Sequence, residues 1–174
     1  MRTATRLFGL PGLTNLGVVD NQLLLLQKDD VDSFIRAEIY RCAQPDPEGY
    51  ASLKDKLGVK SILCLLNVSD KESVELLGMK SIHRSLSYDR LIGLALYTVN
   101  QILAIMQDSS NWPIAIHCAQ GADLTGTICA CYRITQGWTL AEAKEERDAY
   151  GFHAIWVGLN ETLEKFAEQY GAVK

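Results

Sequence analysis

Hydrophobic residues along this chain gather in short runs, and between most of the runs they recur at helical spacing. The clearest run covers residues 59–66, which is almost continuously apolar, as is typical of a strand buried on both faces. Strands are predicted over residues 23–26, 39–41, 59–66, 79–86 and 114–117. We expect the first two at the edge of a sheet, and the weakly alternating fourth run, residues 79–86, away from its centre.

Helices are predicted where apolar residues recur every three or four positions behind a capping residue. Asp46 followed by Pro47 predicts a helix start, and Gly58 predicts its end. Thr139 with Glu142 forms a capping box that opens a charged helix. Further helices are expected over residues 69–78, 91–106, 126–134 and 160–170, and the capping-box helix should run to residue 150.

Strands that alternate with helices predict an α/β fold. We expect a central, mostly parallel sheet of four to five strands, with right-handed crossovers and helices on both faces. The chain has 174 residues and is 48% hydrophobic, which suffices for one packed core. A single domain over residues 1–174 is expected, with a loop-rich entry segment over residues 1–21. Ligands of such folds bind beyond the carboxyl ends of the strands.

The segment over residues 117–126 reads His-Cys-Ala-Gln-Gly-Ala-Asp-Leu-Thr-Gly and joins a predicted strand to a predicted helix. A loop in this place lies at a helix N-terminus. Unpaired N–H groups and the positive end of the helix dipole stabilise a thiolate and a bound phosphoryl group there. Cys118 is therefore the candidate nucleophile, and a small buried hydrophobic residue is the alternative interpretation.

The same segment resembles the signature loop of the cysteine-dependent phosphatases, the protein-tyrosine and dual-specificity superfamily. That loop reads His-Cys, five residues, Arg, Ser or Thr, Gly, and the positions that match it are His117, Cys118, Gly121, Thr125 and Gly126. Residues 39–45, Ile-Tyr-Arg-Cys-Ala-Gln-Pro, are similar to the Tyr-Arg-Ser-x-Gln-Pro of the small bacterial and fungal dual-specificity-like subgroup. The resemblance covers roughly residues 12–160.

This resemblance implies an enzyme that hydrolyses phosphomonoesters through a phosphocysteine on Cys118, with phosphotyrosine, phosphoserine or small phosphorylated molecules as substrates. His117 would orient the loop and favour the thiolate, with a core histidine as the alternative. Thr125 would hydrogen-bond the sulfur, with an ordinary helix cap as the alternative. The residues expected to bind phosphate are Ala119, Gln120, Gly121, Ala122, Asp123 and Leu124.

Two aspartates are candidates for the general acid that protonates the leaving oxygen. Asp89 lies 29 residues before Cys118, close to the spacing of dual-specificity enzymes, and Asp123 lies in the loop, where some relatives place their acid. We favour Asp89, because a mobile loop can bring a protonated carboxyl group to the leaving group. The structural alternatives are a helix cap for Asp89 and hydrogen bonding to the loop backbone for Asp123.

Leu124 stands at the position of the signature arginine. An arginine binds two equatorial phosphoryl oxygens and follows them into the transition state, whereas leucine offers no donor. Ala122 stands where the subgroup often has lysine, so a second cation is missing, and the charge of Asp123 is uncompensated. We therefore expect weaker stabilisation of the thiolate and weaker binding of a dianionic phosphate.

Three functional interpretations fit this loop. The first is a weakened phosphatase, in which Arg41, Arg84 or Arg90 replaces the missing charge. The second is a pseudophosphatase that acts as a binding or regulatory module. The third is a competent enzyme in which Leu124 is an introduced change, so that Leu124→Arg alone restores function.

The composition indicates which classes of partner and which cellular location to expect. A net charge of −4 without a clustered basic face argues against binding to nucleic acid or to an anionic membrane. Neither a signal peptide nor a membrane helix is visible, so a cytoplasmic location is expected. The expected partner is a phosphorylated protein or a small-molecule phosphate, and the oligomeric state stays open.

The five cysteines are an odd number and are expected to be free thiols. A protective disulfide between Cys42 and Cys118 is the open alternative. Cys129 and Cys131 lack further ligands at zinc spacing, and Cys64 lies in a predicted buried strand. We therefore expect core thiols at these three positions, no bound metal and no cofactor.

Overall fold

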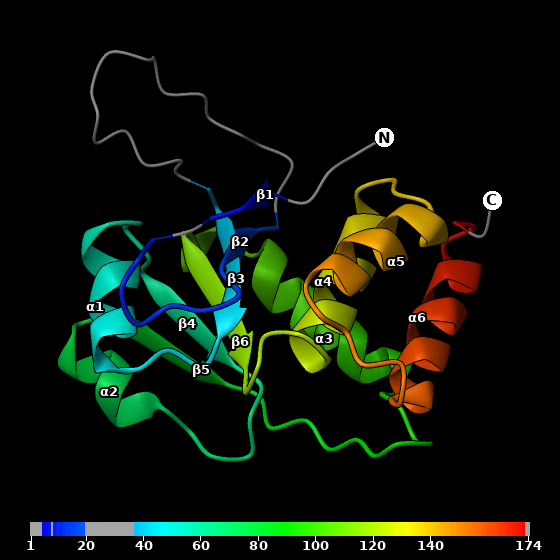
Figure 1. Ribbon diagram of the computed structural model, residues 1–174, viewed down its shortest axis with the longest axis horizontal. Coiled ribbons are helices and arrows are strands. Elements are labelled where there is room, and N and C mark those ends of the chain that lie inside the picture. The colour runs from blue at the N-terminus through cyan, green and yellow to red at the C-terminus, as the bar shows by residue number, and fades with distance from the viewer. Residues whose placement is uncertain (1–4, 8, 20–36, 173–174) are drawn as a thin grey trace, which may run out of the picture.

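The computed structural model describes residues 5–7, 9–19 and 37–172, and shows a sheet between two groups of helices (Figure 1). The strands are β1 (Thr5–Arg6), β2 (Gly17–Val18), β3 (Ile39–Ala43), β4 (Ser61–Cys64), β5 (Lys80–His83) and β6 (Ile114–Cys118). They are ordered β1-β2-β3-β6-β4-β5. The last four run parallel, and β1 and β2 extend one edge in antiparallel orientation. The expected α/β fold with a mostly parallel sheet is confirmed.

The N-terminal part of the sheet differs from the prediction in detail. We expected residues 39–41 at an edge, and this is wrong, because β3 lies between β2 and β6 and all five of its residues are buried. The strands that cover it, β1 and β2, have two residues each, too few to produce an alternating pattern in the sequence. They belong to the entry segment that was expected to be loop-rich. The strand predicted over residues 23–26 falls outside the described residues.

Helices cover both faces of the sheet. They are α1 (Pro47–Asp55), α2 (Lys71–Leu76), α3 (Leu96–Gln107), α4 (Leu124–Thr135), α5 (Leu140–Ala149) and α6 (Val157–Gln169), and residues Ser109–Asn111 add a 3-10 turn. Figure 1 shows α1 and α2 on one side of the strands and α3 to α6 on the other. Two apolar cores result. Leu53 and Val74 pack in the first with Ile62, whereas the second contains residues of all four remaining helices together with Ile116.

Local capping signals set two helix starts where the sequence predicts them. The carboxylate of Asp46 accepts a hydrogen bond from the Gly49 N–H at 2.8 Å, directly before α1. Thr139 and Glu142 form the complete capping box of α5. Both predictions are confirmed, because a cap depends on neighbours in the chain rather than on the rest of the fold.

By contrast, α3 begins five residues later than residue 91, where the sequence predicts its start. The preceding segment is held against α6: the Gly158 N–H donates to the Arg90 carbonyl at 3.1 Å, and the Leu94 N–H donates to the Thr162 hydroxyl at 2.8 Å. A Cβ atom on Gly93 would overlap the backbone of Gly158. These tertiary contacts keep the segment out of the helix even though its apolar spacing suits one.

The carboxyl ends of the central parallel strands meet at one edge of the sheet. Ala43 of β3 is in register with Cys118 of β6, and Cys64 of β4 with His117. Segments that follow these three strands are therefore neighbours, although they are far apart in the sequence. In the described part of the chain, the helices are too short or too polar to cross a lipid bilayer.

Candidate active site

Cys118 is the last residue of β6, and a five-residue turn, residues 119–123, leads from it to the start of α4. The chain can turn this sharply because Gly121 adopts a left-handed φ of +66°. The sulfur of Cys118 thus lies at the N-terminal end of a 12-residue helix, as the sequence predicts. Free N–H groups and the positive end of the dipole act there on an anion.

A cavity of about 460 Å³ opens at this turn. Its lining consists of Leu65, Leu66, Asn67, Leu86, Ser87, Tyr88, Cys118, Ala119, Gln120, Asp123, Leu124 and Trp156. Tyr88 and Trp156 contact each other edge to face, with ring centroids 4.9 Å apart. Cys118 is 5% exposed, so a ligand would reach its sulfur through this cavity.

Within the described residues, the lining of the cavity contains no lysine, arginine or histidine, and its one carboxylic acid is Asp123. Leu124 adds an apolar surface to this lining, at the position where the signature loop described above has arginine. The three arginines considered as replacements lie elsewhere. Arg84 and Arg90 are exposed outside the lining, and Arg84 donates to the His83 carbonyl at 3.0 Å.

Arg41 is buried underneath the loop and does not line the cavity either. Its Nη2 donates to the Gly121 carbonyl at 2.6 Å, and its guanidinium stacks on Tyr150 at 3.9 Å from the ring centroid. No hydrogen-bond partner for Nε or Nη1 is found among the described residues. Arg41 therefore supports the backbone of the loop and lies outside the lining of the cavity.

His117 is fully buried and lies on the opposite face of the sheet from Cys118. Its Nε2 lies 2.8 Å from a carboxylate oxygen of Asp70, and its Nδ1 lies 3.4 Å from the carbonyl oxygen of Cys118. Burial lowers the pKa of His117, but the hydrogen bond to Asp70 and the neighbouring Cys64 outweigh it and raise the pKa to about 9. The histidine of the loop is thus part of a polar network rather than an isolated core residue.

Asp70 is a site residue that the sequence does not reveal. It was expected only to begin a helix, but its side chain makes no cap hydrogen bond to α2 and points to His117 and Tyr50 instead. Burial raises the pKa of Asp70, but the hydrogen bonds from His117 and Tyr50 lower it below its ordinary value. The available signal was its position in the segment that joins β4 to α2, which leaves β4 at the edge of the sheet where Cys118 lies.

Cys64, Asp70 and His117 are also the group in the described residues whose ligand atoms lie close enough for a metal ion, within 4.8 Å of one another. Asp70 and His117 are already joined directly at 2.8 Å, and a second hydrogen bond from Tyr50 reaches the same carboxylate oxygen. We therefore interpret the cluster as a hydrogen-bonded network and not as a metal centre.

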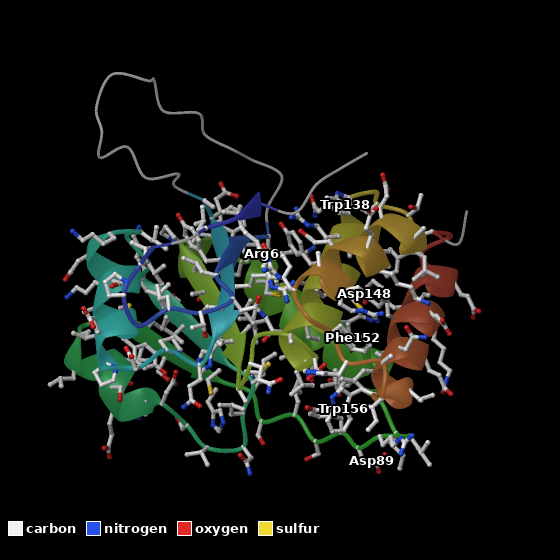
Figure 2. All side chains as sticks on the ribbon, in the orientation of Figure 1. Arg6, Asp89, Trp138, Asp148, Phe152 and Trp156 are labelled. Atoms are coloured by element: carbon white, nitrogen blue, oxygen red, sulfur yellow. The ribbon has the colours of Figure 1, made fainter. Side chains whose placement is uncertain are left out.

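The two candidate acids occupy different places. Asp123 lines the cavity, and its Oδ1 accepts from the His153 backbone N–H at 2.9 Å, while His153 Nδ1 lies 3.1 Å from both carboxylate oxygens. Asp89 is exposed and outside the lining, and its Oδ1 accepts from the N–H groups of Leu91 and Ile92 at 2.7 Å each. Figure 2 shows Asp89 at the periphery of the molecule, beyond Trp156.

Thr125 lies in the first turn of α4 and is fully buried. Its hydroxyl has no hydrogen-bond partner within the described part of the chain, so the expected bond to the sulfur is not formed in this state.

All five cysteines are free thiols, as predicted. Cys42 and Cys118 belong to the cores on opposite faces of the sheet, which separates their sulfurs.

Comparisons with known proteins agree with this geometry. SIW14 of Saccharomyces cerevisiae, an inositol diphosphatase, is 29% identical over 126 residues, which are 69% of this chain and 45% of that protein. The inositol diphosphatase DSP3 of Arabidopsis thaliana is 31% identical over 120 residues, 66% of this chain and 59% of that protein. The chain thus spans about half the length of these curated relatives.

Solved structures show the same architecture. The core catalytic domain of SIW14 in complex with citrate superimposes with a TM-score of 0.67 at 26% identity, over 77% of this chain and 84% of that one. TpbA of P. aeruginosa gives a TM-score of 0.72 at 20% identity, over 97% and 96% of the two chains, which shows the shared fold.

A family model matches residues 30–171, a segment that contains β3, the Cys118 loop and the helices α1 to α6. This match extends well beyond half of the chain. The chain belongs to the tyrosine phosphatase family.

Proposed function

We propose that this chain hydrolyses phosphate monoesters through a phosphocysteine on Cys118, at a rate reduced by Leu124. The observation that carries the proposal is the position of Cys118, which lines the cavity at the N-terminal end of α4. The thiolate attacks phosphorus, the bond to the leaving oxygen breaks, and an acid supplies a proton to that oxygen. Water then attacks the phosphocysteine, releases inorganic phosphate and restores the thiol.

We assign the acid to Asp123 rather than Asp89. Asp123 lines the cavity, whereas the carboxylate of Asp89 is engaged with its own turn outside it. His153 supports this assignment, because its Nδ1 contacts both oxygens of Asp123 and its side chain is 53% exposed. A proton can therefore pass from solvent through His153 to the carboxyl group.

The substrate we propose is a phosphomonoester on a protein or a small molecule with an apolar or aromatic group. Two relatives are named inositol diphosphatases, but the cavity here lacks basic side chains in the described residues and is flanked by Tyr88 and Trp156. A multiply charged substrate would meet no compensating charge there.

Because the reaction needs a reduced thiol and the five cysteines are free, we place the protein in a reducing compartment such as the cytoplasm.

The size of the Leu124 effect follows from the chemistry. A single oxyanion donor contributes about 10²- to 10³-fold in rate, and an arginine in phosphoryl transfer contributes about 10³- to 10⁵-fold. Leu124 lines the cavity, so an arginine at this position has room to extend toward a bound phosphate. The Leu124→Arg chain should therefore hydrolyse phosphate esters at least about 100-fold faster than the unmodified chain.

The test measures p-nitrophenyl phosphate hydrolysis by the unmodified chain, by Leu124→Arg, and by both with Cys118→Ser. We expect slow hydrolysis that disappears with Cys118→Ser, and strong acceleration by Leu124→Arg. Leu124→Lys is the matched control, because it adds charge without the planar fork and should accelerate hydrolysis less. Rates within tenfold of each other for the unmodified and arginine forms would refute the role of Leu124. Absence of Cys118-dependent hydrolysis in both forms would instead indicate a binding module.

A further inference from the structure

Three polar side chains form a buried chain of hydrogen bonds behind the Cys118 loop. The Tyr50 hydroxyl donates to Oδ2 of Asp70 at 2.8 Å, and Nε2 of His117 lies 2.8 Å from the same oxygen. The side chain of His117 has no exposed surface, and that of Asp70 is 5% exposed. Because water competes little for such buried hydrogen bonds, they hold the three side chains in one arrangement.

Both ring nitrogens of His117 face acceptors. Nε2 faces the Asp70 carboxylate, and Nδ1 faces the carbonyl oxygen of Cys118 at a longer 3.4 Å. A neutral imidazole carries one N–H group and would direct a nitrogen lone pair at one of these oxygens. Only the doubly protonated imidazolium donates to both, so the geometry favours the charged ring.

The groups around the ring come from each element packed against it. They are Tyr50 of α1, Cys42 of β3, Cys64 of β4, Asp70 before α2, and Cys118 of its own strand. Burial raises the pKa of Cys42, and burial together with the hydrogen bond to Asp70 raises that of Tyr50, so both groups stay neutral near neutral pH. Asp70 is thus the carboxylate that balances the ring within the described residues, and the guanidinium of Arg41 is directed to Gly121.

We infer that Asp70 is a positioning residue that keeps His117 as an imidazolium directed at the backbone of Cys118. The positive end of this ion pair is the one nearer the thiol, because His117 adjoins Cys118 in β6 and Asp70 lies beyond the ring. In a loop where Leu124 replaces arginine, this imidazolium is a cation that favours the thiolate. Its contribution to hydrolysis rests on the proposed phosphatase function, but its effect on the thiol does not.

The charge of His117 can be measured directly by NMR on protein with isotope-labelled histidine, with His117→Gln to identify its signal. At about pH 7.5 the ring of the unmodified chain should be an imidazolium, and it should lose its proton near pH 9. In Asp70→Asn the ring should be neutral at about pH 7.5, because burial then dominates. Asp55→Asn, an exposed aspartate at the end of α1, is the matched control and should leave the signal unchanged. A neutral His117 in the unmodified chain overturns the inference, whether or not Asp70→Asn folds.

The effect on the thiol is tested by the pH dependence of Cys118 alkylation by iodoacetamide, quantified on the Cys118 peptide by mass spectrometry. Asp70→Asn should raise the pH of half-maximal alkylation rate by about one unit or more. Asp70→Glu retains the carboxylate, so its pH of half-maximal alkylation rate should lie closer to that of the unmodified chain. If Asp70 contributed packing alone, Asp70→Asn and Asp70→Glu should shift this pH equally. Identical profiles for Asp70→Asn and Asp55→Asn overturn the inference.

These two readouts do not depend on phosphate hydrolysis. A charged His117 with a shifted alkylation profile, combined with no Cys118-dependent hydrolysis even in Leu124→Arg, would support the role of Asp70 and refute the phosphatase proposal. Cys118-dependent hydrolysis with a neutral His117 would refute the role of Asp70 alone.

Discussion

Gly121 of the loop lies directly against the backbone of Cys42 in β3. A Cβ atom on Gly121 would overlap the Cys42 carbonyl group and would come within 2.6 Å of the Ala43 nitrogen. The Gln44 N–H also donates to the carbonyl of Ala119 at 3.1 Å. The loop that carries the candidate nucleophile thus packs against the end of the neighbouring strand, with no room for a Cβ atom at Gly121.

Gly121→Ala should therefore destabilise the fold and displace the loop. The left-handed φ of +66° costs an alanine about 1 kcal/mol, and the overlap with Cys42 adds a packing cost, for a total of about 2–4 kcal/mol. Urea-induced unfolding measures this difference. Gly137→Ala is the matched control, because Gly137 also has a positive φ, +82°, but a Cβ there meets no atom within 4 Å. It should cost only about 1 kcal/mol, and equal costs for the two variants would contradict the role given to the Cys42 contact.

A buried ion pair joins α4 to α5. Nε and Nη2 of Arg133 donate to the two carboxylate oxygens of Glu146 at 2.9 and 2.7 Å, and both side chains are 3% exposed. Glu146→Ala leaves the arginine charge buried without its carboxylate and should lower the free energy of unfolding by about 3–5 kcal/mol. Glu145→Ala removes an exposed neighbour on the same helix and should change it by less than about 0.5 kcal/mol. Similar thermal melting points for the two variants would rule out a structural role for the pair.

The sequence predicts those features that depend on neighbouring residues. The starts of α1 and α5 follow from caps at Asp46 and Thr139, and the turn between β6 and α4 follows from an apolar run, a cysteine and two glycines. The start of α3 was misplaced because Gly93 packs on Gly158, 65 positions away in the chain. Nothing in the spacing of apolar residues carries that information.

The same distinction holds for the site. The position of Cys118 and the absence of a cation at Leu124 are visible in the loop sequence itself. The partners of the loop are not, because Asp70 reaches His117 across 47 positions and His153 reaches Asp123 across 30. Pairing of this kind depends on which segments the sheet brings to one edge.

The assignment of the general acid is tested in a Leu124→Arg background, where hydrolysis is fast enough to compare. A good leaving group such as p-nitrophenolate departs with little proton donation from the general acid. The phenolate of phenyl phosphate is a poorer leaving group, so its departure depends strongly on that proton. Asp123→Asn should therefore lower kcat for phenyl phosphate by about 10²-fold or more, and kcat for p-nitrophenyl phosphate much less. Asp89→Asn is the matched control and should leave both values unchanged. A selective loss with Asp89→Asn would return the role to the residue that the sequence favours.

The ion pair of Asp70 and His117 should make stability depend on pH. The pKa of His117 is raised from its usual 6.5 to about 9, so its stabilising contribution is complete below about pH 6.5 and is lost as the pH rises through 9. The pKa of Asp70 is lowered from its usual 3.8, so its contribution is present above that value and is lost as the pH falls below it. The pair therefore stabilises the fold across the range between these limits.

Asp70→Asn should accordingly destabilise the chain by about 2–3 kcal/mol near pH 6, and by clearly less at about pH 10, in urea unfolding at the two pH values. Buried thiols also reduce alkaline stability, since burial raises the pKa of Cys129 to about 11, but they are present in both chains and cancel in the difference. Asp55→Asn should show no such pH dependence. A cost of Asp70→Asn that is equal at the two pH values would mean that Asp70 contributes packing and neutral hydrogen bonds alone, and that His117 is not held in its charged form.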